Sequence, residues 1–377
     1  MAPPATATTG PSLTPFVFDP DAEPPPERVF YAGFIAEGDL VMWVGREKQR
    51  KTNVILQLAI CAALGRDFLQ FRFAAPAPLQ VVYVDYETKT ASLKQRYQAI
   101  CGALRLTEAE REMLSDNLKI FEIRKAEKEG IRIPPFPGAI DKAEDQVSLM
   151  WWQQFVKDHP ADLYIFDPMR CLHTKDENDS NIERVLSGLR GVCKGAAVVV
   201  AHHMTKRGKD DALKLRDGMR LWSEGARGSG ALKAHADEIV CQEQLIEGDR
   251  ETVYIGAFGR DGPDVEPMPL EESDAESFYW QVCPEIPATL RPSFEALRKA
   301  GGRFPNKGPA ARAILEQCGI KRASAYRHID GLLNRGLLRE VAGELVVQAG
   351  VTPAPSEEGF LETVGATRCD ARPLRVS

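Results

Sequence analysis

The residues with the clearest capacity for chemistry lie in a short loop between an apolar run and a helical segment. Residues 39–45 (DLVMWVG) are continuously apolar, as in a buried strand, and residues 52–65 have the composition of a helix that ends at a glycine. Backbone N–H groups at such a turn face an anion at the helix N-terminus. We therefore expect the connecting loop to bind phosphate groups. The loop comprises Gly45, Arg46, Glu47, Lys48, Gln49, Arg50, Lys51, Thr52 and Asn53.

The spacing of this loop follows the phosphate-binding pattern G-x-x-x-x-G-K-[ST] with one departure. In this pattern Lys51 reaches the β- and γ-phosphates of ATP, and Thr52 ligates Mg²⁺. Arg50 stands where the pattern has its second glycine, which lets the backbone approach the phosphates without a Cβ. Arginine must adopt the glycine conformation or reshape the loop, and its guanidinium can add charge toward the phosphates. The sequence predicts ATP and Mg²⁺ binding more firmly than hydrolysis; the alternative is a basic loop before a helix.

Carboxylates and histidines follow three later apolar runs. VVYVDYE ends with Asp85 and Glu87, and a carboxylate there is placed to activate the water that attacks the γ-phosphate. LYIFD ends at Asp167, in the pattern that holds Mg²⁺ through water. AHH ends with His202 and His203, and a polar group at that strand end can sense the γ-phosphate. For the histidines a strand-end hydrogen bond or a metal site stays open, although neighbours in a strand point to opposite faces.

A polar segment of mixed charge, residues 204–226, contains one candidate basic residue and precedes another, and we expect the segment to be a mobile loop. Lys206 lies at its start and belongs to the candidate nucleotide-binding set. Arg227 follows it in RGSGAL and is a candidate arginine finger that acts across a subunit interface. The alternative for Arg227 is a plain surface arginine.

The elements that must position these groups alternate between short apolar runs and helical stretches. Continuously apolar strands separated by helices predict a parallel sheet covered on both faces, with functional groups at the carboxyl ends of its strands. Strands are expected at 39–45, 79–87, 118–123, 162–167 and 196–203, and helices at 52–65, 89–104, 144–158 and 180–193.

The sheet is expected to end in antiparallel strands. Residues 236–244 and 251–260 are predicted to form a hairpin, and residues 278–282 a last edge strand. The stretch between them, residues 263–276, is rich in proline and acidic residues and is predicted to be a linker.

The chain contains, in this order, the motifs GREK-x-x-KT, VDYE, FDP, HHMTK and RGSGAL. This order resembles that of the RepA-like hexameric helicases, a branch of the RecA-like P-loop ATPases that comprises AAA family ATPases of mobile elements. The resemblance covers about residues 30–260 and implies a RecA-like α/β fold with a mostly parallel sheet. It implies that Lys51 and Thr52 bind phosphate and Mg²⁺, that Glu87 is the catalytic carboxylate, and that Asp167 handles Mg²⁺.

The same resemblance assigns roles to the basic residues. It implies that the pair His202 and His203 senses nucleotide or couples to DNA, and that Lys206 and Arg227 lie toward the nucleotide of a neighbouring subunit. Arg50 departs from the family pattern, which puts turnover in doubt.

The C-terminal part has a different pattern and a different charge. Residues 291–348 contain 11 Lys and Arg against 5 Asp and Glu, a net charge of +6. Because the whole chain has a net charge of −6, the other residues together carry −12. Helices at 293–301, 308–319 and 320–336, followed by two short strands around Gly343, resemble a winged helix-turn-helix. The second helix of such a pair enters the major groove of DNA. A use in protein contacts is the alternative. The predicted DNA-binding residues are Lys321, Arg322, Ser324, Tyr326 and Arg327.

Composition bounds the remaining possibilities. An apolar fraction of 44% and a charged fraction of 27% are ordinary for globular protein, and no apolar run reaches the ~20 residues of a membrane span. We expect a cytoplasmic protein with a disordered arm at 1–28, an ATPase domain at 29–285, a winged helix-turn-helix domain at 291–348 and a flexible tail at 349–377. Eight cysteines without a C-x-x-C pair indicate reduced thiols rather than a zinc site or disulfides.

These observations favour an ATP-hydrolysing, DNA-associated motor or switch that assembles into a hexamer or filament. A second hypothesis is a nucleotide-gated DNA-binding regulator with little or no hydrolysis, and Arg50 is the feature that distinguishes the two. A third is a relative of circadian-clock or recombinase proteins of the RecA type, which the predicted winged domain disfavours.

Overall fold

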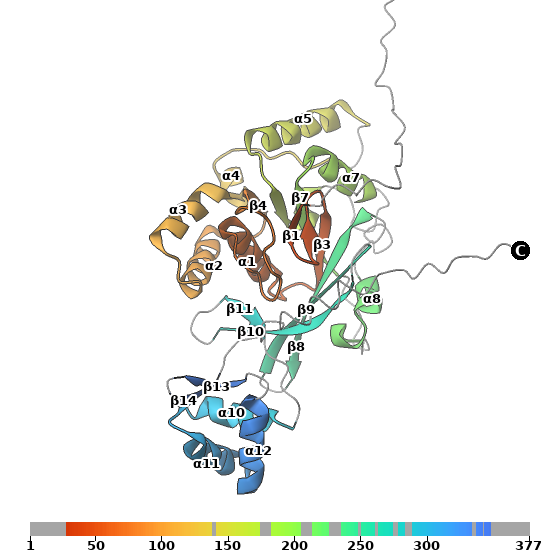
Figure 1. Ribbon diagram of the computed structural model, residues 1–377. Coiled ribbons are helices and arrows are strands. Elements are labelled where there is room, and N and C mark those ends of the chain that lie inside the picture. The colour runs from red at the N-terminus through yellow and green to blue at the C-terminus, as the bar shows by residue number, and fades with distance from the viewer. Residues whose placement is uncertain are drawn as a thin grey trace, which may run out of the picture.

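A large, mostly parallel β-sheet is the centre of the molecule (Figure 1). The computed structural model describes residues 28–137, 141–173, 182–204, 213–225, 235–247, 250–260, 263–273, 278–282, 289–333, 337–341 and 343–347. The sheet has nine strands in the order β11-β10-β9-β8-β3-β7-β6-β4-β5. A separate hairpin of β1 (Val29–Tyr31) and β2 (Ile35–Ala36), absent from the sequence-based prediction, precedes it.

The parallel half of the sheet confirms the predicted α/β fold. It contains β3 (Leu40–Gly45), β4 (Val81–Asp85), β5 (Leu118–Glu122), β6 (Leu163–Asp167), β7 (Ala197–His203) and β8 (Glu238–Glu247). Every residue of β3, β4, β6 and β7 is buried, which explains their uninterrupted apolar sequences. The register pairs Gly45 with His203 and Asp85 with Asp167, so the predicted functional groups share one edge of the sheet.

The antiparallel half contains one strand that the sequence did not predict. The hairpin of β8 and β9 (Arg250–Gly259) and the edge strand β11 (Trp280–Val282) were expected and are present. Between β9 and β11 lies β10 (Val265–Glu272), so the predicted linker at 263–276 was wrong. Prolines in a sheet are confined mainly to edges and bulges, and an irregularity in the register between Val265 and Met268 accommodates Pro267.

Helices cover both faces of the sheet (Figure 1). One face packs against α1 (Lys51–Leu64), α2 (Thr90–Ala103) and α3 (Glu108–Asn117), and the other against α5 (Ala143–Asp158) and α7 (Ile182–Val192). The short helices α4 (Ile123–Lys128), α6 (Met169–Leu172) and α8 (Met219–Trp222) complete this part. The helices α3 and α4 were not predicted. Among the described residues, no helix is long and apolar enough to span a membrane.

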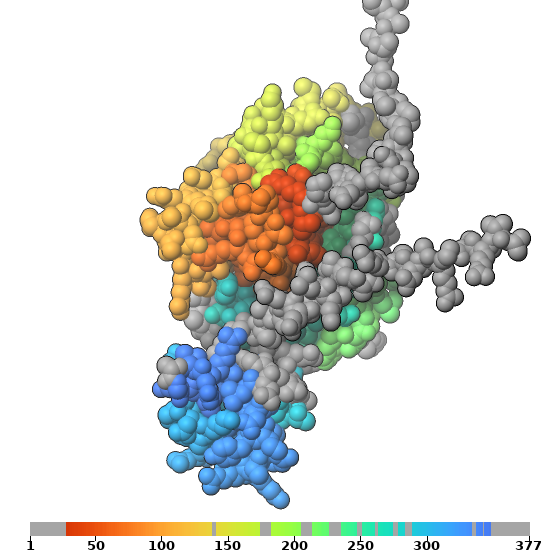
Figure 2. Space-filling view, in the orientation of Figure 1, coloured from red at the N-terminus to blue at the C-terminus, as the bar shows by residue number. Residues whose placement is uncertain are grey.

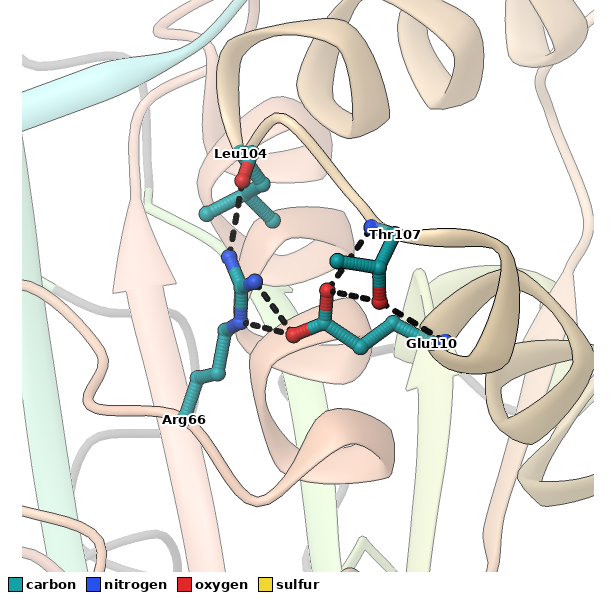
Figure 3. Close-up of polar contacts among 4 residues, drawn as sticks. All are labelled: Arg66, Leu104, Thr107 and Glu110. Atoms are coloured by element: carbon teal, nitrogen blue, oxygen red, sulfur yellow. Dashed lines mark hydrogen bonds and ion pairs between the residues drawn. The ribbon is translucent and has the colours of Figure 1, made fainter.

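A polar network fixes the far end of α1 (Figure 3). The helix ends at Gly65, which has the left-handed conformation that favours glycine. Arg66 then donates to the Leu104 carbonyl at 2.8 Å and forms an ion pair with Glu110. Glu110 also accepts from the Thr107 N–H as part of a capping box, and these contacts lower its pKa to about 2. The network ties α1, which begins at the phosphate loop, to α2 and α3.

The segment predicted as a mobile loop is packed where the structure describes it. Residues 213–225 form two 3-10 turns (Leu215–Asp217 and Ser223–Gly225) around α8. Leu215 and Trp222 are fully buried, so the expectation of a mobile loop is wrong for these residues. Their apolar side chains are spaced too irregularly among charges to produce a helical pattern in the sequence.

The C-terminal residues form a small unit with its own core. Helices α10 (Arg291–Lys299), α11 (Lys307–Cys318) and α12 (Arg322–Leu333) pack on a three-stranded sheet of β12 (Arg303–Phe304), β14 (Glu344–Val347) and β13 (Leu338–Val341). Figure 2 shows this C-terminal unit in blue as a lobe that projects from the body. An ion pair of 3.7 Å between Arg298 and Glu271 joins it to β10. The three predicted helices and the two predicted strands, β13 and β14, are confirmed, and β12 was not predicted.

Candidate nucleotide site

The lysine of the phosphate loop is buried at the start of α1. Lys51 Nζ donates to the carbonyls of Gly45 at 2.8 Å and Arg46 at 2.7 Å, and lies 3.2 Å from His203 Nδ1. Burial lowers the pKa of Lys51 to about 8, while the carboxylate of Asp167 opposes this shift. The contact with His203 brings together two residues that the sequence assigned to the same site. Replacing Lys51 or His203 with an apolar residue would remove this contact from the buried side chain of the other.

The loop approaches the neighbouring strand so closely that only glycine fits at its first position. A Cβ on Gly45 would lie 2.6 Å from the Gln242 carbonyl oxygen of β8. The Gln242 side chain donates to the Gln49 carbonyl at 2.5 Å and accepts from Trp43 Nε1 at 2.9 Å. Gln49 in turn accepts from the Arg46 N–H at 3.0 Å. Sequence reasoning missed Gln242, because its partner in the loop is 193 residues away.

Arg50 adopts the conformation of the glycine that it replaces. Its φ of 63° and ψ of 13° are left-handed, and it occupies the N-cap of α1. Its Nε lies 3.5 Å from the Glu251 carboxylate on β9. The guanidinium is thus oriented toward the β8–β9 hairpin, and the backbone turn of the pattern is retained without the glycine. Lys48 has a left-handed φ as well, at 62°.

Two aspartates end adjacent strands beside Thr52. Asp167 Oδ2 accepts from the Tyr83 hydroxyl at 2.8 Å, and Asp167 also accepts from the Thr52 hydroxyl. Burial, and next the charge of Asp85, raise the pKa of Asp167 to about 6. Asp85 Oδ1 accepts from the N–H groups of Glu87 and Thr88 at 2.9 and 2.6 Å. Burial raises the pKa of Asp85.

This group of oxygens fits a hydrated divalent cation. Asp85 Oδ2 is buried and has no hydrogen-bond partner within the described part of the chain. Together with Thr52 and Asp167 it presents hydroxyl and carboxylate oxygens, the ligands that Mg²⁺ prefers, either directly or through water. A cation here would also offset the repulsion that raises the pKa of Asp167. The residues present therefore suit Mg²⁺ beside the phosphate loop.

Glu87 lies just beyond β4 and faces a residue that sequence reasoning missed. Arg170 Nη2 lies 3.1 Å from Glu87 Oε1, and Arg170 Nη1 lies 3.9 Å from Glu47 Oε1. The Cys171 thiol also donates to Glu87 Oε1 at 3.5 Å. Glu87 remains partly exposed. No local pattern in the sequence distinguishes Arg170 from a surface arginine, because its partners come from two other segments.

The remaining predicted residues of the nucleotide site divide into two groups. Asn53, in the first turn of α1, and His202, near the end of β7, are both buried. Lys206 and Arg227 lie outside the described residues.

The five predicted DNA-binding residues lie in the first half of α12 or just before it. Lys321, Arg322 and Arg327 are exposed, and the Arg322 guanidinium lies 6.0 Å from the centre of the Tyr326 ring. Arg327 donates to the Ser324 hydroxyl at 3.1 Å. On its opposite face, α12 packs Ile329 and Leu332 into the core of the C-terminal unit.

The sheet order, the strand-to-helix phosphate loop and the acids at the strand ends define a RecA-like P-loop ATPase. A family model described as an AAA domain matches residues 8–209, which is more than half of the chain. The chain belongs to this AAA domain family. This match is to the AAA domain family as a whole and does not distinguish the RepA-like helicase branch within it.

Other comparisons are more distant. The fold is similar to that of a KaiC-like protein from Pyrococcus horikoshii, with 14% identity, a TM-score of 0.44, and coverage of 68% of this chain and 94% of that chain. It is also similar to the flagellar accessory protein FlaH from Methanocaldococcus jannaschii, with 12% identity, a TM-score of 0.43, and coverage of 68% and 93%. The comparison with curated proteins gives no match.

Proposed function

We propose that the protein is an ATP-hydrolysing, DNA-associated motor or switch of the RepA-like helicase type. The observation that carries the proposal is the convergence of Lys51, Thr52, Asp167, His203 and Glu87 at one edge of the sheet. These residues come from the ends of four strands, which are far apart in the sequence. Their convergence supports nucleotide chemistry at this edge, and membership of the AAA domain family supports ATP as the nucleotide.

Each residue has a defined task in this proposal. Lys51 neutralises charge on the β- and γ-phosphates, and Thr52 and Asp167 hold Mg²⁺, directly or through water. Bound Mg²⁺ supplies charge neutralisation at the phosphate oxygens. Glu87 accepts a proton on its carboxylate from the attacking water. His203, in contact with Lys51, is placed to respond to the terminal phosphate.

A nucleotide-gated DNA-binding regulator with little hydrolysis is the second candidate. Arg50 favours it, because a side chain in the left-handed region at the N-cap of α1 stands where the motor pattern has glycine. ATP turnover measured without DNA, with single-stranded DNA and with duplex DNA separates the candidates. The motor proposal expects turnover that DNA stimulates. ATP binding without turnover in any of the three conditions would favour the regulator and reject the motor.

We propose further that the C-terminal unit is a winged helix-turn-helix that binds duplex DNA through α12. The exposed cations at the start of α12 and the net charge of +6 over residues 291–348 support this. Phosphate contacts make affinity fall steeply with salt. In the full-length chain, replacing Lys321, Arg322 and Arg327 with alanine should weaken duplex binding in fluorescence anisotropy and flatten its salt dependence.

The matched control is a pair of basic residues of the same unit that lie outside α12. Arg303 and Lys307 are exposed and paired with Glu344 and Asp330. Their replacement should leave the affinity and its salt dependence close to those of the wild type. Equal binding by the triple α12 variant and the wild type would assign the unit to protein contacts instead.

We propose that the protein assembles into a ring or filament in which Arg227 reaches the nucleotide of a neighbouring subunit. The proposal rests on the position of Arg227 after segment 204–226 and on the family resemblance. An arginine finger contributes ~10³-fold or more to the rate. Mixing Arg227→Ala with Lys51→Ala subunits should restore part of the turnover, because some interfaces then combine an intact loop with an intact finger. A fully active monomer would contradict this arrangement.

A further inference from the structure

Arg170 lies between the two acidic residues that flank the candidate nucleotide site, and neither the sequence motifs nor the proposed function uses it. It follows Asp167 by three residues, in the short helix α6. Met169 and Leu172 of α6 are buried in the core, so the helix is anchored on one side. Arg170 and Cys171 lie on its exposed side, and both contact Glu87.

The guanidinium joins three chain segments. Its Nη2 lies 3.1 Å from Glu87, which follows β4, and its Nη1 lies 3.9 Å from Glu47, which belongs to the phosphate loop. The planar fork of arginine suits such a bridge between two carboxylates, which the point charge of lysine cannot reproduce. The charges of Glu87 and Glu47 contribute to raising the pKa of Arg170, as expected for a cation held between acids.

Such a bridge has little value for stability. The side chains of Arg170 and Glu87 are 49% and 37% exposed, and ion pairs of this kind add little to the folded state. Its effect on orientation is larger, because a general base must be held close to its productive position and a displacement of about 1 Å can lower a rate by about 100-fold.

We propose that Arg170 is a positioning residue that holds the Glu87 carboxylate at a fixed place relative to the phosphate loop. The proposal rests on the proposed function, in which Glu87 is the general base. Arg170 acts through Glu87 and Glu47. Loss of Arg170 then affects the chemical step and leaves nucleotide binding largely intact.

The first test is the steady-state kinetics of ATP hydrolysis by Arg170→Ala. We expect kcat to fall by roughly 10- to 100-fold while KM and the calorimetric affinity for Mg–ATP change by less than about threefold. Arg170→Lys should recover part of the loss, since its ammonium can still pair with one carboxylate. In a Glu87→Gln background, Arg170→Ala should have no further effect, because the residue that it positions has lost its function.

The matched control is Arg28→Ala. Arg28 also bridges two carboxylates, Glu37 at 3.4 Å and Asp162 at 2.9 Å, at the opposite edge of the sheet. We expect its kcat to equal that of the wild type. Thermal unfolding of both variants shows whether any loss of activity is a loss of fold.

A second measurement reports the contact without turnover. Burial, and next the charge of Glu87, raise the pKa of the Cys171 thiol to about 11, and Arg170 opposes this shift. Alkylation of Cys171, followed by mass spectrometry at pH 9, should therefore be slower in Arg170→Ala and faster in Glu87→Gln than in the wild type.

The outcomes separate this proposal from the proposed function. If Glu87→Gln abolishes turnover but Arg170→Ala keeps the wild-type kcat, the positioning role is wrong and the proposed function stands. A rise in kcat, or a loss confined to nucleotide affinity, also overturns it, since Arg170 would then restrain the site or contact the phosphates. If Glu87→Gln turns over ATP as fast as the wild type, both proposals fail.

Discussion

The two edges of the central sheet both carry a row of acidic residues, and they use them differently. At the amino edge three aspartates have structural partners. Asp39 accepts from the Ala36 N–H at 2.6 Å, Asp162 accepts from the Gln80 N–H at 2.8 Å, and Asp237 accepts from the Leu40 N–H at 2.8 Å. These carboxylates satisfy backbone donors where strands begin, so their charges stabilise the turns.

At the carboxyl edge the two aspartates Asp85 and Asp167 present carboxylate oxygens that are able to bind a cation. Asp167 is buried beside Asp85, and one oxygen of Asp85 lacks a partner among the described residues. A buried lysine, Lys51, lies near enough for the charge of Asp167 to act on its ammonium group. The comparison shows that carboxylates at strand ends do not by themselves indicate a site. An incomplete set of partners, together with a buried opposite charge, separates a binding edge from a structural edge.

The largest expected effect is on turnover at the carboxyl edge. Glu87→Gln keeps the shape of the side chain and removes the base, so kcat should fall by about 10²- to 10⁴-fold while ATP stays bound. Steady-state hydrolysis measures the change in kcat, and single-turnover hydrolysis measures the change in the chemical step alone. Glu122→Gln is the control, because Glu122 ends the neighbouring strand β5 but has no proposed role. A Glu87→Gln variant as active as the wild type would reject the assignment.

The amino edge should respond to substitution through stability alone. Asp237→Ala leaves the buried Leu40 N–H without its acceptor and should lower the free energy of unfolding by about 1–3 kcal/mol. Asp237→Asn retains an acceptor oxygen and should lose less. Chemical denaturation measures both, and kcat per folded molecule should stay at the wild-type value. A selective loss of kcat would remove the distinction between the two edges.

A smaller effect is expected at the altered glycine position. Arg50→Gly relieves a side chain in the left-handed region, loses the Glu251 contact, and gains freedom in the unfolded chain. These terms are each about 1 kcal/mol or less and partly cancel. Because the guanidinium faces β9, ATP affinity measured by calorimetry should change by less than about threefold. A tenfold loss would show that Arg50 contacts the phosphates.

The smallest effect concerns the pH dependence of stability at the amino edge. Burial, and next the charges of Asp39 and Asp264, raise the pKa of Glu238 to about 8. Because the folded pKa exceeds the unfolded value of 4.5, the unfolded chain releases this proton first, and stability is lost as pH rises from about 4.5 to about 8.

Glu238→Gln removes this titration. Its melting temperature should equal that of the wild type at pH 4 and exceed it at pH 8.5 by roughly 2–4 °C, a modest amount because the group is partly exposed. Differential scanning calorimetry across this range tests the sign. A higher melting temperature for the wild type at pH 8.5 would contradict the raised pKa of the Glu238 carboxyl.

The sequence predicted the parallel half of the fold well, because buried parallel strands have unbroken apolar runs. It failed where local signals and tertiary packing disagree. Pro267 and Pro269 indicate a linker, yet β10 pairs on both sides. The charges around Leu215 and Trp222 indicate a loop, yet both side chains are buried against the sheet, where Glu243 of β8 accepts from the Trp222 indole.

The candidate site followed the same division. Lys51, Thr52 and Asp167 were predictable because their spacing from strand ends is a local property. Gln242 and Arg170 were not, since each acts on residues distant in sequence that only the folded sheet brings close. The sequence left two alternatives for Arg50, the conformation of the glycine that it replaces or a reshaped loop. Its left-handed backbone shows that it adopts the glycine conformation.

The most direct test of the nucleotide site is the affinity of Mg–ATP for the wild type and for Lys51→Ala, measured by isothermal titration calorimetry. The predicted result is clear binding by the wild type and a loss of roughly 100-fold or more in the variant, since a buried ammonium within the phosphate loop is removed. Lys194→Ala, an exposed lysine between α7 and β7, should bind as the wild type does. Equal affinity of the wild type and Lys51→Ala would contradict the placement of the nucleotide at the carboxyl edge of the sheet.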